Sequence, residues 1–90
     1  MTFLCGEVEG LATLWEDHPV EVEAMLVRHD EITSAAFSGH GGRVLSSGGD
    51  GFAVMFDDPQ EAVDAAVEAQ RALAAEPWPV DTPVRSRIGI

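Results

Sequence analysis

Lysine is absent from this sequence, and its basic residues are five arginines against 16 acidic residues. The formal net charge at pH 7 is −11, with the histidines counted as neutral. A chain this acidic is repelled by the phosphate backbone of nucleic acids and by anionic lipid headgroups. The charge balance therefore predicts no nucleic-acid partner and no membrane partner. A nucleotide that carries Mg²⁺ is still compatible with this acidic charge, because the metal reverses the local charge.

Cysteine and long apolar runs are also scarce. Cys5 is the single cysteine, so no disulfide can form within the chain, and this fits a reducing compartment. No apolar run approaches the ~18–20 residues that span a bilayer, and the chain start lacks the features of a signal peptide. Ninety residues fit one domain, residues 1–90. We therefore expect one cytoplasmic domain.

Four short segments have the composition of β-strands. The first is mostly apolar and the last alternates apolar with charged residues, which is typical of a half-buried strand. The two middle segments are separated by "GGDG", and glycine with aspartate favours a tight hairpin turn. The predicted strands are Thr2–Val8, Arg43–Ser47, Phe52–Asp57 and Val84–Ile90.

Apolar spacing predicts helices in the remaining segments. Residues 10–19 and 20–38 have helical spacing and are separated at Pro19, so they predict one helical region split in two. Residues 57–76 form the clearest helix, with Asp58 as N-cap and Pro59 in its first position. The face of this helix that we predict to be buried consists of Ala62, Val63, Ala66, Val67, Gln70, Leu73 and Ala74.

The order of these elements predicts an α+β fold. Strand, split helix, two strands, helix and strand give the ferredoxin-like βαββαβ plan. In that plan the sheet is antiparallel, the first and third strands are neighbours in its centre, and the helices cover one face.

Some polar residues have simple structural interpretations. By local sequence alone, Asp50 is a turn aspartate that caps its own backbone. The three histidines lack zinc-site spacing, and we interpret His18 and His40 as loop or capping residues and His29 as a helix-surface residue. Cys5 is interpreted as a buried strand residue without a neighbouring base.

Four segments share their order along the chain and the spacing between them with a known family of domains. They are "TFLCGEVEGLATLWEDHP", "RHDEI", "HGGRVLSSGGDGFAVMFDDPQEAVDAAVEAQRALAAEPWP" and "VRSRIGI". Together they resemble the N-terminal half of the class III adenylate/guanylate cyclase catalytic domain. The resemblance implies a site formed between two subunits, in which two aspartates hold two Mg²⁺ or Mn²⁺ ions against a nucleotide. It also implies a base-reading lysine in the hairpin strand and further catalytic groups in the second half of the domain.

The resemblance assigns roles to six positions of this chain. Asp50 matches one metal ligand, and Glu7 stands where the other aspartate is usual. Glutamate is one methylene longer, and Mg²⁺ demands near-ideal geometry. Ser46 takes the place of the base-reading lysine. The backbone of Val8, Glu9 and Gly10 matches the loop that holds the phosphates.

The altered positions suggest three hypotheses. The first is a degenerate, truncated cyclase-like domain without activity alone, which serves as an association or regulatory module. Its partner is a second copy or a cyclase-family protein that pairs with the Val84–Ile90 edge. The second is a half-site contributor to an active cyclase heterodimer that uses two-metal phosphoryl transfer. The third is a diguanylate cyclase-like domain, because "SGGDGF" resembles the turn of that family.

Overall fold

The computed structural model describes residues 1–48, 51–79 and 84–90. Its helices are α1 (Leu11–Asp17), α2 (Val22–Gly39) and α3 (Pro59–Ala75), and its strands are β1 (Thr2–Val8), β2 (Arg43–Gly48), β3 (Gly51–Phe56) and β4 (Ser86–Gly89). No helix in the described ranges has the length and apolarity needed to cross a membrane.

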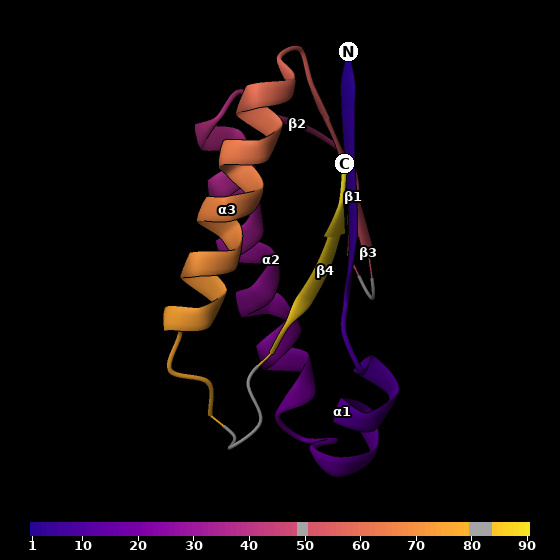
Figure 1. The fold of residues 1–90 in the computed structure, drawn as a ribbon. Helices are drawn as coiled ribbons and strands as arrows, with labels where there is room; N and C mark the ends of the chain where they lie inside the picture. The colour runs from indigo at the N-terminus through magenta and orange to yellow at the C-terminus, as the bar shows by residue number, and fades with distance from the viewer. Residues whose placement is uncertain (49–50, 80–83) are drawn as a thin grey trace.

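The four strands form one sheet with the order β2-β3-β1-β4. Each neighbouring pair is antiparallel, and β1 lies beside β3 from Thr2 opposite Phe56 to Glu7 opposite Gly51. In Figure 1, α2 and α3 lie on one side of this sheet, and α1 lies beyond the end of β1. The predicted α+β, ferredoxin-like arrangement is therefore confirmed, including the central position of the first and third strands.

The edge strand β2 contains an irregularity. Val44 pairs with Val54 and Ser46 with Ala53, so Leu45 is an extra residue on β2, which is the pattern of a β-bulge. The Leu45 side chain is 56% exposed. The opposite edge, β4, keeps a regular register against β1.

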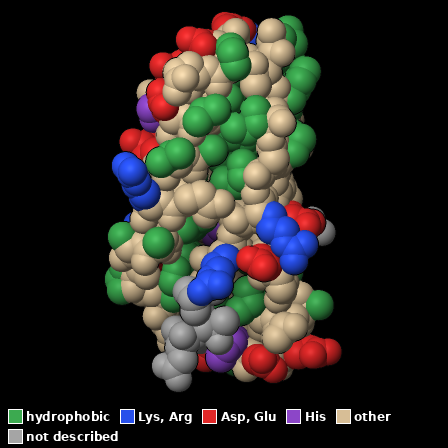
Figure 2. Space-filling model, viewed as in Figure 1, with side chains coloured by type: hydrophobic (Ala, Val, Ile, Leu, Met, Phe, Trp, Pro, Cys, Tyr) green, Lys and Arg blue, Asp and Glu red, His purple; other side chains and the backbone are tan. Residues whose placement is uncertain are grey.

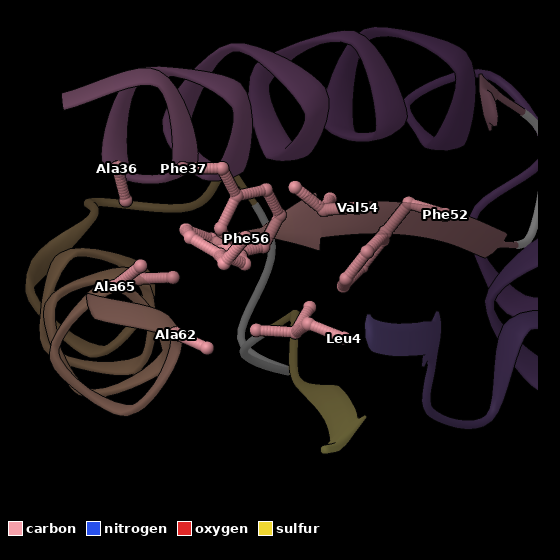
Figure 3. Close-up of a cluster of buried hydrophobic side chains, with 9 residues drawn as sticks. Leu4, Ala36, Phe37, Phe52, Val54, Phe56, Ala62 and Ala65 are labelled. Carbon is pink, nitrogen blue, oxygen red and sulfur yellow. The ribbon is translucent and has the colours of Figure 1, made fainter. Parts of the chain in front are cut away.

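The largest buried cluster lies between the sheet and the two long helices. Phe37 of α2 is in the middle of it, with its ring centroid 5.2 Å from that of Phe52 and 6.5 Å from that of Phe56. Small residues of α3 allow this helix to approach the aromatic rings, as Figure 3 shows. The buried members are Leu4, Ala36, Phe37, Phe52, Val54, Phe56, Ala62, Ala65 and Ala69.

The start of α3 agrees with the prediction from the sequence, but the buried face of the helix does not. Asp58 is the N-cap, and its Oδ1 accepts a hydrogen bond of 2.9 Å from the amide of Gln60. The buried residues of the helix are Ala62, Ala65, Ala69 and Leu73. Val63 and Val67 are each 44% exposed, and Gln70 and Ala74 are exposed too, so the prediction that these four residues face the core was wrong. Alanine allows closer packing than valine, and apolar residues occur nearly all around this helix.

Two further predictions about single residues were wrong. His29 is 1% exposed and lies inside the protein beside Phe52, not on the helix surface, because it shares the face of Met25 and Ile32. Cys5 is exposed, not buried, because alternate residues of β1 point to the face opposite the long helices. Phe3, which is 51% exposed, points to the same side as Cys5.

Candidate functional site

The candidate site lies where β1 ends, β3 begins and β4 begins. Glu7 of β1 is directly opposite Gly51 of β3 on one side and Arg87 of β4 on the other. The prediction that the first strand brings Glu7 beside the hairpin strand is therefore confirmed. Asp50, the other predicted metal ligand, lies outside the described residues.

Arg87 is the main neighbour of the Glu7 carboxylate. Its Nη1 is 3.9 Å from Oε1 of Glu7, and its Nη2 is 3.7 Å from Oε1 of Glu9. The three side chains are exposed, so each ion pair is worth only about 0–1 kcal/mol. Figure 2 shows arginine and acidic side chains close together in this part of the surface. One guanidinium thus lies beside the first predicted metal position and its acidic neighbour and offsets one of their two negative charges.

Arg87 was not predicted from the sequence as part of this site. The motif resemblance concerned the first strand and the hairpin, whereas Arg87 comes from the last strand. The fold plan places the fourth strand beside the first, but the register decides which of its two arginines lies opposite Glu7. The alternation of "VRSRIGI" does not contain that information.

The segment predicted to hold phosphates has its backbone partly engaged within the fold. The Glu9 amide donates a hydrogen bond of 2.8 Å to the carbonyl of Arg85. Val8 is 6% exposed, and Gly10 has φ 66°, a left-handed conformation that favours glycine. The amide of Leu14 donates to the Gly10 carbonyl at 3.1 Å and opens the first turn of α1.

Ser46 lies on the same open face of the sheet as Glu7. It is opposite Ala53, which is in turn opposite Cys5 of β1, and Cys5 is two residues before Glu7. Ser46 is exposed and carries no charge. This position can therefore offer a hydrogen bond, but not the charged contact of a lysine.

A groove of about 470 Å³ runs along the end of β1. It is bounded by acidic and apolar side chains together with Arg87, namely Glu7, Val8, Glu9, Gly10, Leu11, Ala12, Trp15 and Arg87. A second groove of about 400 Å³ lies on the other side of the Glu7–Arg87 pair, beside Cys5 and Ile88. Carboxylates are suitable ligands for a cation, but in the first groove the Arg87 guanidinium already lies beside Glu7 and Glu9.

The fold of this chain matches that of known proteins. Neither a protein-family model nor a curated protein matches the sequence. Solved structures do match, each over 97% of this chain. Adenylate cyclases from Trypanosoma brucei in their monomeric state match with a TM-score of 0.91 at 15% identity. The guanylyl cyclase Cya2 matches with 0.83 at 27%, and an adenylate/guanylate cyclase/hydrolase from Silicibacter pomeroyi with 0.78 at 28%.

This chain has the fold of half a class III nucleotide cyclase domain. It spans 53%, 50% and 52% of the three matched chains, which is about half of each. The resemblance that the sequence motifs indicated is thus confirmed for the fold.

Proposed function

We propose that this class III cyclase-like half-domain has no cyclase activity alone and acts as an association or regulatory module in cyclic-nucleotide signalling. The observation that carries this proposal is the position of Arg87. Its guanidinium lies within 3.9 Å of the Glu7 carboxylate, where the family resemblance implies a metal ligand.

The described residues fit a divalent metal at Glu7 poorly. A metal ion would have to bind beside a guanidinium, and two positive charges ~4–5 Å apart repel each other even near a protein surface. The same guanidinium lies 3.7 Å from the Glu9 carboxylate, so both carboxylates beside the predicted metal position already have a cationic neighbour. The Glu9 amide, which would contribute to phosphate binding, already donates to Arg85.

Association is supported by apolar surface near the β4 edge. Ile88 is only partly buried and Ile90 is 60% exposed. Val63 and Val67 of α3 are also exposed, and Figure 2 shows hydrophobic side chains grouped between α3 and the sheet edge. A regular edge strand offers unpaired backbone groups to another strand, and apolar side chains beside it add hydrophobic contact. A second copy or a cyclase-family partner that pairs along Val84–Ile90 would use both.

The activity of the purified chain tests the first part of the proposal. ATP and GTP are each incubated with the protein and Mn²⁺, and cyclic nucleotide is measured by chromatography. We expect no product above the protein-free blank. A second arm adds the chain to a complete class III cyclase, whose activity we expect to stay the same or to fall, because an associated module without a working site contributes no catalytic group.

Each arm can contradict the proposal in a different way. Turnover by the chain alone would show that the Glu7–Arg87 site supports catalysis. Increased product only in the mixture would favour the alternative function, a half-site contributor to a heterodimer. That alternative draws support from the exposure of Glu7, whose side chain is 62% exposed on an uncovered sheet face.

Replacement of Ile90 by lysine tests association at the β4 edge. Burial of an isoleucine is worth about 1.5–3 kcal/mol, so Ile90→Lys is expected to weaken self-association roughly tenfold to a hundredfold. Sedimentation velocity over a concentration series measures the effect. The matched control is Val27→Lys, because Val27 is 58% exposed but lies on α2. A wild-type chain that stays monomeric, or equal weakening by both variants, would contradict self-association through this edge.

A further inference from the structure

Three side chains with metal-binding atoms meet where the end of α2 lies beside the start of α3. One nitrogen of His40 and one oxygen each of Glu61 and Asp64 lie within 4.8 Å of one another. Within residues 1–48, 51–79 and 84–90, this is the one group of three or more histidine, cysteine, aspartate or glutamate side chains with such spacing. Figure 2 shows a histidine among acidic side chains over the upper end of α3.

The fold builds this group from two separate segments. His40 follows the last residue of α2, and its amide donates to the Phe37 carbonyl at 3.2 Å. Gly41, with φ 75°, then turns the chain away toward β2. Glu61 lies in the first turn of α3 and Asp64 one turn later, so both carboxylates project from the same side of the helix. His40 thus contributes the one ligand that does not come from α3.

Both ring nitrogens of His40 have a carboxylate beside them. Nδ1 is 3.2 Å from Oε2 of Glu61, and Nε2 is 3.5 Å from Oε2 of Glu68. Asp64 adds a third carboxylate near this ring. Like charges three and four residues apart on α3 repel each other, and a cation bound between the imidazole and the carboxylates reduces this repulsion.

A groove of about 570 Å³ gives access to the group. It is lined by His40, Asp64, Val67, Glu68 and Arg71. Arg71 provides one positive charge against the three carboxylates of Glu61, Asp64 and Glu68. The side-chain amide of Gln60 donates a hydrogen bond of 2.9 Å to Oδ1 of Asp64, which leaves the other carboxylate oxygen for a ligand. Water can reach the open side and complete a coordination shell.

We propose that His40, Glu61 and Asp64 bind a divalent first-row transition metal ion such as Zn²⁺. An imidazole ligand favours Zn²⁺ and its neighbours in the series over Mg²⁺ and Ca²⁺, which prefer oxygen ligands alone. Three protein ligands with an open fourth position are a common zinc arrangement. The bound ion would connect the turn after α2 to the first half of α3. Because only the folded chain brings these residues together, binding would stabilise the fold.

This site is separate from the Glu7–Arg87 pair and does not depend on the proposed function. His40 and α3 belong to the helical layer, whereas Glu7 projects from the uncovered face of the sheet. Zinc binding here can therefore be tested independently of any cyclase activity.

Zinc titration of the purified chain tests the proposal. Isothermal titration calorimetry measures affinity, and thermal melts are recorded with and without about a hundredfold excess of Zn²⁺ over the dissociation constant. We expect the melting temperature to rise by about 10 °C. Mg²⁺ at the same concentration is expected to have little effect. Co²⁺ replaces Zn²⁺ in a parallel experiment, because its visible absorption reports ligand geometry.

Four variants assign the site to its ligands. His40→Gln and Glu61→Gln are each expected to lower zinc affinity at least about tenfold and to reduce the Co²⁺ absorption. The matched histidine control is His18→Gln, at the end of α1 and remote from α3, and it is expected to bind zinc like wild type. Cys5→Ser controls for the exposed thiol and is also expected to bind normally. Circular dichroism shows whether each variant is folded.

Several results would overturn the proposal. Absence of zinc binding by the wild-type chain is one, and equal stabilisation by Mg²⁺ is another, since it would indicate only an acidic surface. Wild-type affinity in folded His40→Gln would exclude the imidazole as a ligand. Loss of binding in Cys5→Ser would place zinc at the thiol instead.

Discussion

The Phe37→Ala variant is expected to lose about 3–5 kcal/mol of unfolding free energy, which is much of the stability of a domain this small. Phe37 is 1% exposed and joins α2 to the sheet through Phe52 and Phe56. Its removal leaves a cavity that neighbours on three elements would have to fill. Urea unfolding measures the change as a lower midpoint at an unchanged slope.

Two other variants make this prediction specific. Phe37→Leu keeps most of the volume and is expected to cost less, on the order of 1–2 kcal/mol, so it stays measurable if the alanine variant is unfolded. Phe3→Ala removes the same side chain from the uncovered sheet face, where it is 51% exposed, and is expected to cost under about 1 kcal/mol. Equal losses for Phe3→Ala and Phe37→Ala would contradict the buried position of Phe37.

Acid is expected to destabilise the protein through His29. Burial lowers the pKa of His29 in the folded state, and the hydrogen bond with Asp30 opposes this shift only in part. Its Nε2 atom has no hydrogen-bond partner among the described residues. The folded state therefore favours the neutral imidazole, whereas the unfolded chain takes up the proton near the ordinary pKa of about 6.5.

The sign of the pH effect follows from this difference. Well above pH 6.5 neither state binds the proton, and the contribution of His29 to stability is complete. Below that value the unfolded state binds it first, so the unfolding free energy falls with decreasing pH, by up to about 1.4 kcal/mol per pH unit, until the folded state is protonated too. Urea unfolding between about pH 7.5 and 5 measures this dependence.

Two variants separate His29 from the other titrating groups. His29→Leu removes the unpaired nitrogen and is expected to stay within about 1 kcal/mol of wild type at pH 7.5, with a flatter decline in acid. Asp30→Asn removes the contact that favours the charged imidazole, so the decline is expected to continue to lower pH. An identical acid dependence in wild type and His29→Leu would rule out His29 as the source.

The sequence predicted the order and pairing of the strands because local signals were strong there. "GGDG" marks a hairpin, the "VRSRIGI" alternation marks a strand, and Asp58 with Pro59 marks the start of α3. The buried faces were harder to predict. Apolar residues surround α3 so completely that periodicity could not separate Ala65 and Ala69 from Val63 and Val67.

The candidate site was predicted only where it depends on strand order. Neighbouring first and third strands were enough to place Glu7 beside the hairpin strand. The partnership of Glu7 with Arg87 depends on the register of β1 with β4, and the group around His40 depends on how α2 and α3 are aligned. Residue spacing along the chain determines neither, because both are set by packing between distant segments.

The bulge at Leu45 makes the two edges of the sheet unequal, and this restricts the assemblies that edge pairing can form. A bulged edge is a poor template for another strand, so β2 is not expected to pair with the β4 edge of a second copy. Head-to-tail joining, which would extend without limit into a fibre, is therefore disfavoured. Pairing of β4 with β4 uses the same surface on both copies and closes after two chains, as a dimer with twofold symmetry. One extra residue on an edge strand thus limits the size of any complex built through the opposite edge.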